Sequence, residues 1–120
     1  MKKLIAGVLV FAMILCLANC SSKYESNAID AANSYVSSQF YNDFGVAADS
    51  MDCKVIYGGK DSNGNALHLI GVRCYWNGTP AASYCVYTKL GSFRNSTQVL
   101  PSGYDFNENI GSLKALFGII

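Results

Sequence analysis

The spacing of apolar residues along the chain predicts a leader followed by a helix. Residues 4–17 form an almost unbroken apolar run behind two lysines. The segment Tyr24–Phe44 then carries apolar side chains at intervals of three and four, which is the period of a helix with one buried face. This stripe consists of Ile29, Ala32, Val36, Phe40 and Phe44. We expect Ser26 to cap the helix and Gly45 to end it.

Stretches rich in β-branched and aromatic residues follow, and turn residues separate them. We expect strands at Met51–Tyr57, Ala66–Trp76, Ser83–Leu90 and, as a short edge strand, Ser96–Leu100. A second helical spacing predicts a helix over Asp105–Phe117, with a stripe of Phe106, Ile110, Leu113 and Phe117. This order predicts an α+β domain with an N-terminal helix, a three- to four-stranded antiparallel meander and a C-terminal helix.

Two expected turns fix how the strands pair. A two-residue turn at Asn63-Gly64 would place Cys53 opposite Cys74, and a four-residue loop at Gly78–Ala81 would place Cys74 opposite Cys85. The three cysteines would then lie in one row across three strands. Such a row allows one disulfide with a thiol left over, three small buried side chains, or a thiolate metal site. No Cys-x-x-Cys pair supports the metal site, so we expect no metal and no cofactor.

The same register assigns each strand residue to one of two faces. The expected core face carries Cys53, Val55, Tyr57, Ile70, Val72, Cys74, Trp76, Cys85 and Tyr87. The opposite face mixes aromatic and charged side chains, a combination that is common on binding surfaces. Its candidate binding residues are Lys54, Arg73, Tyr75 and Tyr84, next to a hairpin tip at Gly58–Asn65. A shift of one residue in the pairing would exchange the two faces.

The charge of the chain excludes some classes of partner. Two of the nine Lys and Arg residues, Lys2 and Lys3, belong to the leader, so seven remain against eight Asp and Glu. Beyond the leader, no two basic residues are adjacent. A nucleic-acid-binding protein needs a concentrated basic patch, so we expect no nucleic-acid partner.

The leader resembles the signal sequence of bacterial lipoproteins. Leu17, Ala18 and Cys20 match the lipobox Leu-Ala-Gly/Ala-Cys, and Asn19 departs from its small residue. In that family the cysteine sulfur receives a diacylglycerol, and cleavage makes this cysteine the first mature residue. The resemblance implies a signal peptide at 1–19, a lipidated Cys20 with a short tether at 20–23, and one domain at 24–120. It implies a membrane anchor in the cell envelope, at the outer membrane where the host has one. An ordinary cleaved signal and a secreted protein is the alternative.

Motifs for catalysis are missing from the chain. The lone His68 has no defensible Ser or Cys partner by spacing, and Gly58-Gly59-Lys60 lacks the remainder of a phosphate loop. We therefore expect no catalytic residues and favour a binding module, whose partner is another envelope protein, an exogenous protein or cell-wall material. A thiol-dependent redox protein or enzyme that uses the cysteine row is the first alternative. A structural envelope protein or a phage-exclusion lipoprotein is the second.

Overall fold

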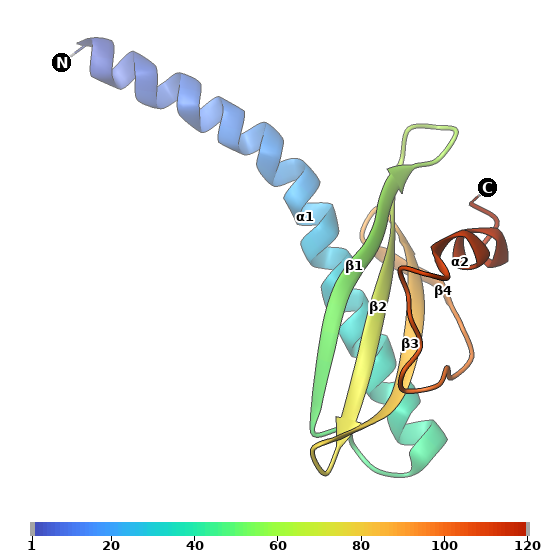
Figure 1. Ribbon diagram of the computed structural model, residues 1–120. Coiled ribbons are helices and arrows are strands. Elements are labelled where there is room, and N and C mark those ends of the chain that lie inside the picture. Colours follow the sequence, from blue (N-terminus) through green and yellow to red (C-terminus); the bar gives the residue numbers. More distant parts are fainter. Residues whose placement is uncertain (1, 120) are drawn as a thin grey trace.

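The computed structural model describes the backbone of residues 2–119 and the side chains of residues 23–119. Its elements are α1 (Lys2–Phe44), β1 (Ser50–Lys60), β2 (Ala66–Trp76), β3 (Thr79–Lys89), β4 (Ser92–Ser96) and α2 (Ile110–Leu116). The strands form one antiparallel sheet in the order β1-β2-β3-β4. One face of this sheet packs on α1, and the short α2 lies on the other side (Figure 1). The α+β meander expected from the sequence is confirmed.

The first helix is longer than the sequence pattern predicts. It is one helix of 43 residues, and its N-terminal half extends away from the sheet (Figure 1). The expected tether at 20–23 is helical, and Ser26 caps nothing because it lies in the interior of α1. Within the part of the chain whose side chains are described, no helix has an apolar stretch of the length that crossing a bilayer requires. The predicted apolar stripe is confirmed at Ala32, Val36 and Phe40, which are buried together with the neighbouring Ala28. Ile29 is half-buried, and Phe44 at the end of the helix is exposed, contrary to the prediction.

The first hairpin has a longer loop than expected, because Asp61 organises it. The Asp61 carboxylate accepts the N–H groups of Asn63 and Asn65 at 2.9 and 2.8 Å, and Lys89 pairs with it at 2.8 Å. Asp61 and Asn65 close the loop with a backbone hydrogen bond. A bulge at Ile56 shifts the pairing once more. Cys53 therefore pairs with Val72, and Cys74 pairs with Met51.

The second hairpin differs more, and the difference exchanges the two faces of β3. Asn77 and Gly78 alone form the turn, with φ of 53° and 74°. Positive φ at both central residues is the signature of the tight hairpin turn that matches strand twist. A bulge follows this turn, because the register shifts between Cys74 and Tyr75 and leaves Ala81 as an extra residue of β3. Gly71 rather than Cys74 therefore pairs with Cys85. Tyr84 consequently points toward α1, while Cys85 points toward α2, and the predicted three-cysteine row is wrong.

The fourth strand lies earlier in the chain than expected. Leu90 and Gly91 form a second tight turn, with φ of 53° and 78°, so the chain pairs again from Ser92. Of the segment expected as the edge strand, Ser96–Leu100, only Ser96 belongs to β4, where it pairs with Val86. Further along, Leu100 forms an isolated bridge with Ser83. A Leu-Gly pair is a weak turn signal, because leucine rarely adopts positive φ.

Two apolar clusters, one on each face of the sheet, form the core. The larger one packs α1 against Ile70, Val72, Cys74, Tyr84 and Val86. The smaller one joins Leu69 and Cys85 to Phe106 and Leu113. The C-terminal helix begins only at Ile110, and the expected first turns form a loop in which Asp105 accepts the Glu108 N–H at 3.0 Å. This loop inserts the Phe106 ring against β2.

Gly71 is the position where this insertion can be tested. A Cβ added at Gly71 would lie 2.8 Å from the Phe106 ring, whereas a Cβ at Gly111 in α2 would meet no atom within 4 Å. Gly71→Ala should lower the free energy of unfolding by about 1–3 kcal/mol, which is typical of overpacking. Gly111→Ala is the matched control and should raise it by roughly 0.5–1 kcal/mol, because alanine favours helix. Urea unfolding measures both. Equal stability of the two variants would contradict the close packing of Phe106 on β2.

Candidate functional site

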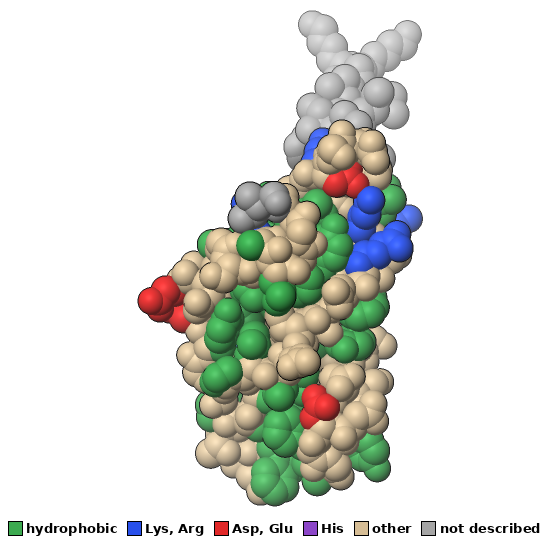
Figure 2. Space-filling model, turned by 90° about the vertical axis from the view of Figure 1, so that its right-hand side faces the viewer, with side chains coloured by type: hydrophobic (Ala, Val, Ile, Leu, Met, Phe, Trp, Pro, Cys, Tyr) green, Lys and Arg blue, Asp and Glu red, His purple; other side chains and the backbone are tan. Residues whose placement is uncertain are grey.

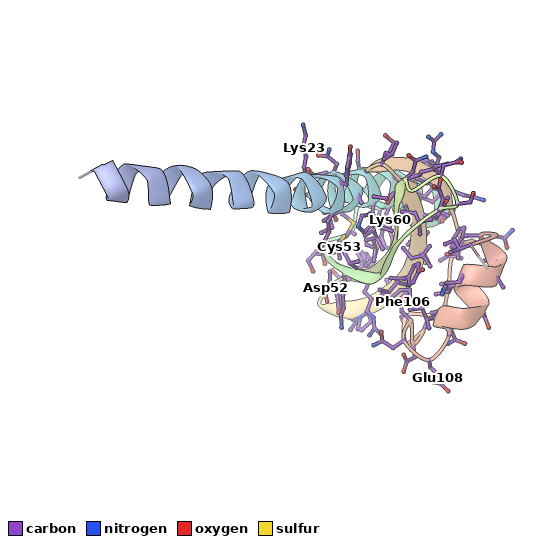
Figure 3. All side chains as sticks on the ribbon, turned by 90° about the horizontal axis from the view of Figure 1, so that it is seen from above. Lys23, Asp52, Cys53, Lys60, Phe106 and Glu108 are labelled. Atoms are coloured by element: carbon purple, nitrogen blue, oxygen red, sulfur yellow. The ribbon has the colours of Figure 1, made fainter. Side chains whose placement is uncertain are left out.

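Three of the four predicted binding residues come together at one depression. Lys54, Arg73 and Tyr75 line a hollow of about 210 Å³ on the face of the sheet opposite α1. We call it the charged depression; its other lining residues are Asp52, Ile56, Asp105, Phe106 and Asn107. Figure 3 shows Asp52 on this side of β1 and Cys53 on the side of α1. The strand alternation therefore separates the polar surface from the core.

Arg73 is the best-positioned group in the charged depression. It is half-buried, its guanidinium carbon lies 5.7 Å from the centre of the Phe106 ring, and it donates to the Tyr104 carbonyl at 3.1 Å. Asp52 is its partner across the strands, so an opposite charge lies beside it on β1. Among the described residues, the one ion pair is Lys89–Asp61. The guanidinium is thus held in place by a ring and one carbonyl, and most of its five N–H donors remain free for a ligand.

Tyr84 does not belong to this surface, contrary to the prediction. It is fully buried against α1, and its hydroxyl donates to the Asp43 carboxylate at 2.8 Å. Burial and the Asp43 carboxylate together raise the pKa of Tyr84 well above its usual range. The side chain is part of the core and ties β3 to the end of α1.

The cysteines lie on two different faces of the sheet. All three are free, and Cys53 donates to the Asn33 side-chain oxygen of α1 at 2.7 Å. Burial raises the pKa of Cys53 and of Cys74 to about 11, with smaller contributions from Asp52 and Cys53 respectively, and raises the pKa of Cys85 to about 12. A reactive thiol needs a lowered pKa, because the thiolate is the nucleophile. Cys74 and Cys85 are buried, Cys53 is half-buried, and the pKa of each thiol is raised rather than lowered.

His68 lies in β2 on the side of α1, away from the charged depression. It is buried, and its Nδ1 atom has no hydrogen-bond partner among the described residues. Burial lowers the pKa of this imidazole, and the Glu25 carboxylate opposes the shift in part. No cluster of three His, Cys, Asp or Glu side chains suitable for a metal ion occurs in the described part of the chain. His68 is therefore a neutral core histidine in this fold.

Sequence reasoning missed a second depression and part of the first. Asp105, Phe106 and Asn107 reach the charged depression from the loop before α2, a long-range contact that no local pattern indicates. On the side that carries α2, apolar side chains gather among uncharged polar ones (Figure 2). A wider hollow of about 580 Å³ lies there, between α2 and the segment 95–100. Its lining holds no charged side chain, so it offers little selectivity by charge.

Comparisons of the chain with family models, with curated proteins and with solved structures each found no match. The residues and their geometry are therefore the basis for any assignment of function.

The pKa of His68 generates a testable pH dependence. A histidine whose pKa is lower in the folded than in the unfolded chain binds fewer protons when folded. Its contribution to stability is complete above the unfolded value of 6.5 and is lost as the pH falls through the folded value. The free energy of unfolding should therefore decrease as the pH is lowered from about 7 to about 5. His68→Gln should flatten this slope in urea titrations, and a slope that persists in the variant would contradict the burial of a neutral imidazole.

Proposed function

We propose that the chain is a lipid-anchored protein of the bacterial cell envelope whose folded domain binds another envelope protein. Two independent features support the two parts of this proposal. The leader and Cys20 resemble a lipoprotein signal, which supports the anchor. The charged depression supports the binding role. The side chains of the leader lie outside the described residues, so the anchor rests on sequence alone.

The main observation in support of a binding role is that the Arg73 guanidinium is already oriented and has free N–H donors. Its guanidinium is oriented by Phe106 and by the Tyr104 carbonyl, with Lys54 and Tyr75 at the same hollow. A planar guanidinium that is already oriented recognises a carboxylate by two parallel hydrogen bonds, and little entropy is lost on binding. A tyrosine beside it adds a large contact area at low entropic cost. The partner surface we infer presents a carboxylate to Arg73 and an apolar group to Tyr75.

The charges around Arg73 narrow the class of partner further. Asp52 and Asp105 line the same hollow as Lys54 and Arg73, so charges of both signs border it. A strongly anionic polymer would meet these two carboxylates and be repelled. A protein surface or peptide that carries both signs can match all four groups. This pattern favours a protein partner over an anionic polysaccharide or a nucleic acid.

The thiol-dependent alternative has less support. It requires cysteines that lie together and ionise easily, whereas Cys85 lies on the face opposite Cys53 and Cys74. The raised pKa of each thiol opposes nucleophilic chemistry near neutral pH.

The anchor is tested by two cysteine variants in the leader. Cys20→Ser should abolish incorporation of a labelled fatty acid and leave the leader uncleaved, because serine has no sulfur to form the thioether. Cys16→Ser is the matched control, since it removes a thiol four residues earlier in the same leader. Intact mass of the membrane-extracted protein reports cleavage and acylation together. Normal processing of Cys20→Ser would contradict the anchor.

The binding surface is tested by Tyr75→Ala and Arg73→Lys, which removes the guanidinium fork but keeps the charge. Each should reduce recovery of co-purifying envelope proteins by about tenfold, the effect expected of a residue central to an interface. Tyr41→Ala is the control, because Tyr41 is a tyrosine of α1 that is 59% exposed and lies outside the depression. Quantitative mass spectrometry of tagged full-length protein measures recovery. An unchanged partner set in both variants would show that the depression is not the binding surface.

A further inference from the structure

One edge of the sheet is open. β1 is the outermost strand, eleven residues long, and among the described residues it pairs only with β2 (Figure 1). An open edge presents unpaired backbone donors and acceptors, and proteins usually protect such an edge from other strands. The chemistry of β1 therefore decides which strand it can accept.

The hydrogen-bond alternation identifies the backbone groups that face the open edge. The Ala66 carbonyl accepts the Leu90 N–H at 2.7 Å, so even-numbered residues at this end of β2 direct their backbone groups to β3. The odd-numbered residues Gly71 and Arg73 then direct theirs to β1, where Lys54 and Asp52 are their partners. The residues of β1 that flank Asp52 and Lys54 are Met51, Cys53 and Val55. Their N–H and C=O groups point away from β2, toward the open edge.

The sequence of this outward segment is complementary to itself. If two copies of β1 run antiparallel with Cys53 opposite Cys53, Asp52 of each copy faces Lys54 of the other. Met51 of each copy then faces Val55 of the other, on the side of α1. Asp52 and Lys54 are both exposed on the opposite face of the strand. They would form two symmetric cross-strand pairs of opposite charge, in the positions where side chains approach most closely.

The same charges act against the neighbouring registers. A two-fold pairing centred on Asp52 places two carboxylates opposite each other, and one centred on Lys54 places two ammonium groups opposite each other. Like charges directly opposite are destabilising. The bulge at Ile56 ends the regular segment on one side. Asp52 and Lys54 therefore disfavour the neighbouring registers and favour the one centred on Cys53.

We propose that two copies of the chain associate through β1, antiparallel and centred on Cys53, to form one continuous sheet. The two-fold axis runs perpendicular to the sheet, as in closed symmetric dimers. The two α1 helices then lie antiparallel on one side of the joined sheet, and both charged depressions face the other side. The pairing uses Asp52 and Lys54 at the rim and leaves Arg73 and Tyr75 accessible. It depends on the folded domain and not on the lipid anchor.

Charge reversal tests the register directly. Asp52→Lys and Lys54→Asp each convert both opposite-charge pairs into like-charge pairs, and each should weaken dimerisation by about tenfold or more. The double variant Asp52→Lys/Lys54→Asp restores the pairs with exchanged signs and should recover dimerisation to within about threefold. Lys60→Glu is the control, because it reverses an exposed charge of the same strand outside the paired segment. Light scattering of the detergent-extracted full chain measures the mass against concentration.

Cys53 reports the centre of the pairing. Opposite residues in a hydrogen-bonded pair have Cα atoms about 5.5 Å apart, which a disulfide can span. Mild oxidation of membranes at alkaline pH, with diamide accepting the two electrons and two protons, should join Cys53 to Cys53. Mass spectrometry of the linked peptides identifies this bond apart from any that involves Cys20. The bond should disappear in both single charge variants and return in the double variant.

Specific outcomes would overturn the proposal. A monomeric mass at all concentrations together with no Cys53–Cys53 peptide would do so. A dimer that is unaffected by either single reversal would also overturn it. Loss of dimerisation in the double variant as in the single ones, with unchanged unfolding midpoints, would exclude this register. If Cys20→Ser does not alter processing, the lipid anchor is contradicted, but the dimer mass and the Cys53–Cys53 peptide still test the dimer. The two proposals can therefore fail separately.

Discussion

The pairing of β2 with β3 through the two-residue turn at Asn77-Gly78 decides what the rest of the sheet can do. Side chains alternate between faces along a strand, so replacing a four-residue loop by a two-residue turn keeps the faces of β3. The bulge after this turn, where Ala81 is one extra residue of β3, exchanges them. With this turn and bulge, Tyr84 and Val86 pack under α1, and Cys85 joins Phe106 and Leu113 on the other side. The turn also places Pro80 near the start of β3, beyond the reach of β4. A proline is tolerated there because no neighbouring strand needs its missing donor.

The elements could be predicted from the sequence because local periodicity determines them. The apolar stripe of α1 and the stretches of β1, β2 and β3 follow directly from spacing and residue type. The register could not be predicted, because the competing turns differ by small local energies. The Asp61 carboxylate, which binds two backbone N–H groups and Lys89, outweighs the shorter Asn63-Gly64 turn. The sequence pattern predicts a start of α2 that is too early, because the spacing from Phe106 onward fits a helix locally, whereas the Phe106 ring packs at Gly71 and α2 begins at Ile110.

Part of the candidate site could be predicted from the sequence. Which part depends on whether the register error between two strands is an even or an odd number of residues. From Ser50 to Val55 the true pairing of β1 with β2 differs from the expected one by two residues, so the faces are kept and Lys54, Arg73 and Tyr75 remain together. Beyond the bulge the difference is one residue, and Tyr57 lies with Leu69 on the side of α2 instead of on the expected core face. Between β2 and β3 the difference is three residues, so Tyr84 is lost from the surface and the cysteine row is broken. Asp105 and Phe106 come from a distant loop, and only tertiary packing brings them to the depression. Strand arithmetic is thus reliable for faces only where its error is even.

β1 can take part in both ligand contact and self-association, and the two roles share only the side chains of Asp52 and Lys54. The side chains of Asp52 and Lys54 point to the face of the charged depression, and their backbone groups bond to β2. The backbone groups of Met51, Cys53 and Val55 point to the open edge, and their side chains pack toward α1. A partner strand at that edge would engage Asp52 and Lys54 at the rim, leave Arg73 and Tyr75 accessible, and bring a second depression beside the first on the same face. Two anchored copies arranged in this way would present a doubled binding surface to one partner, which raises avidity without any new contact.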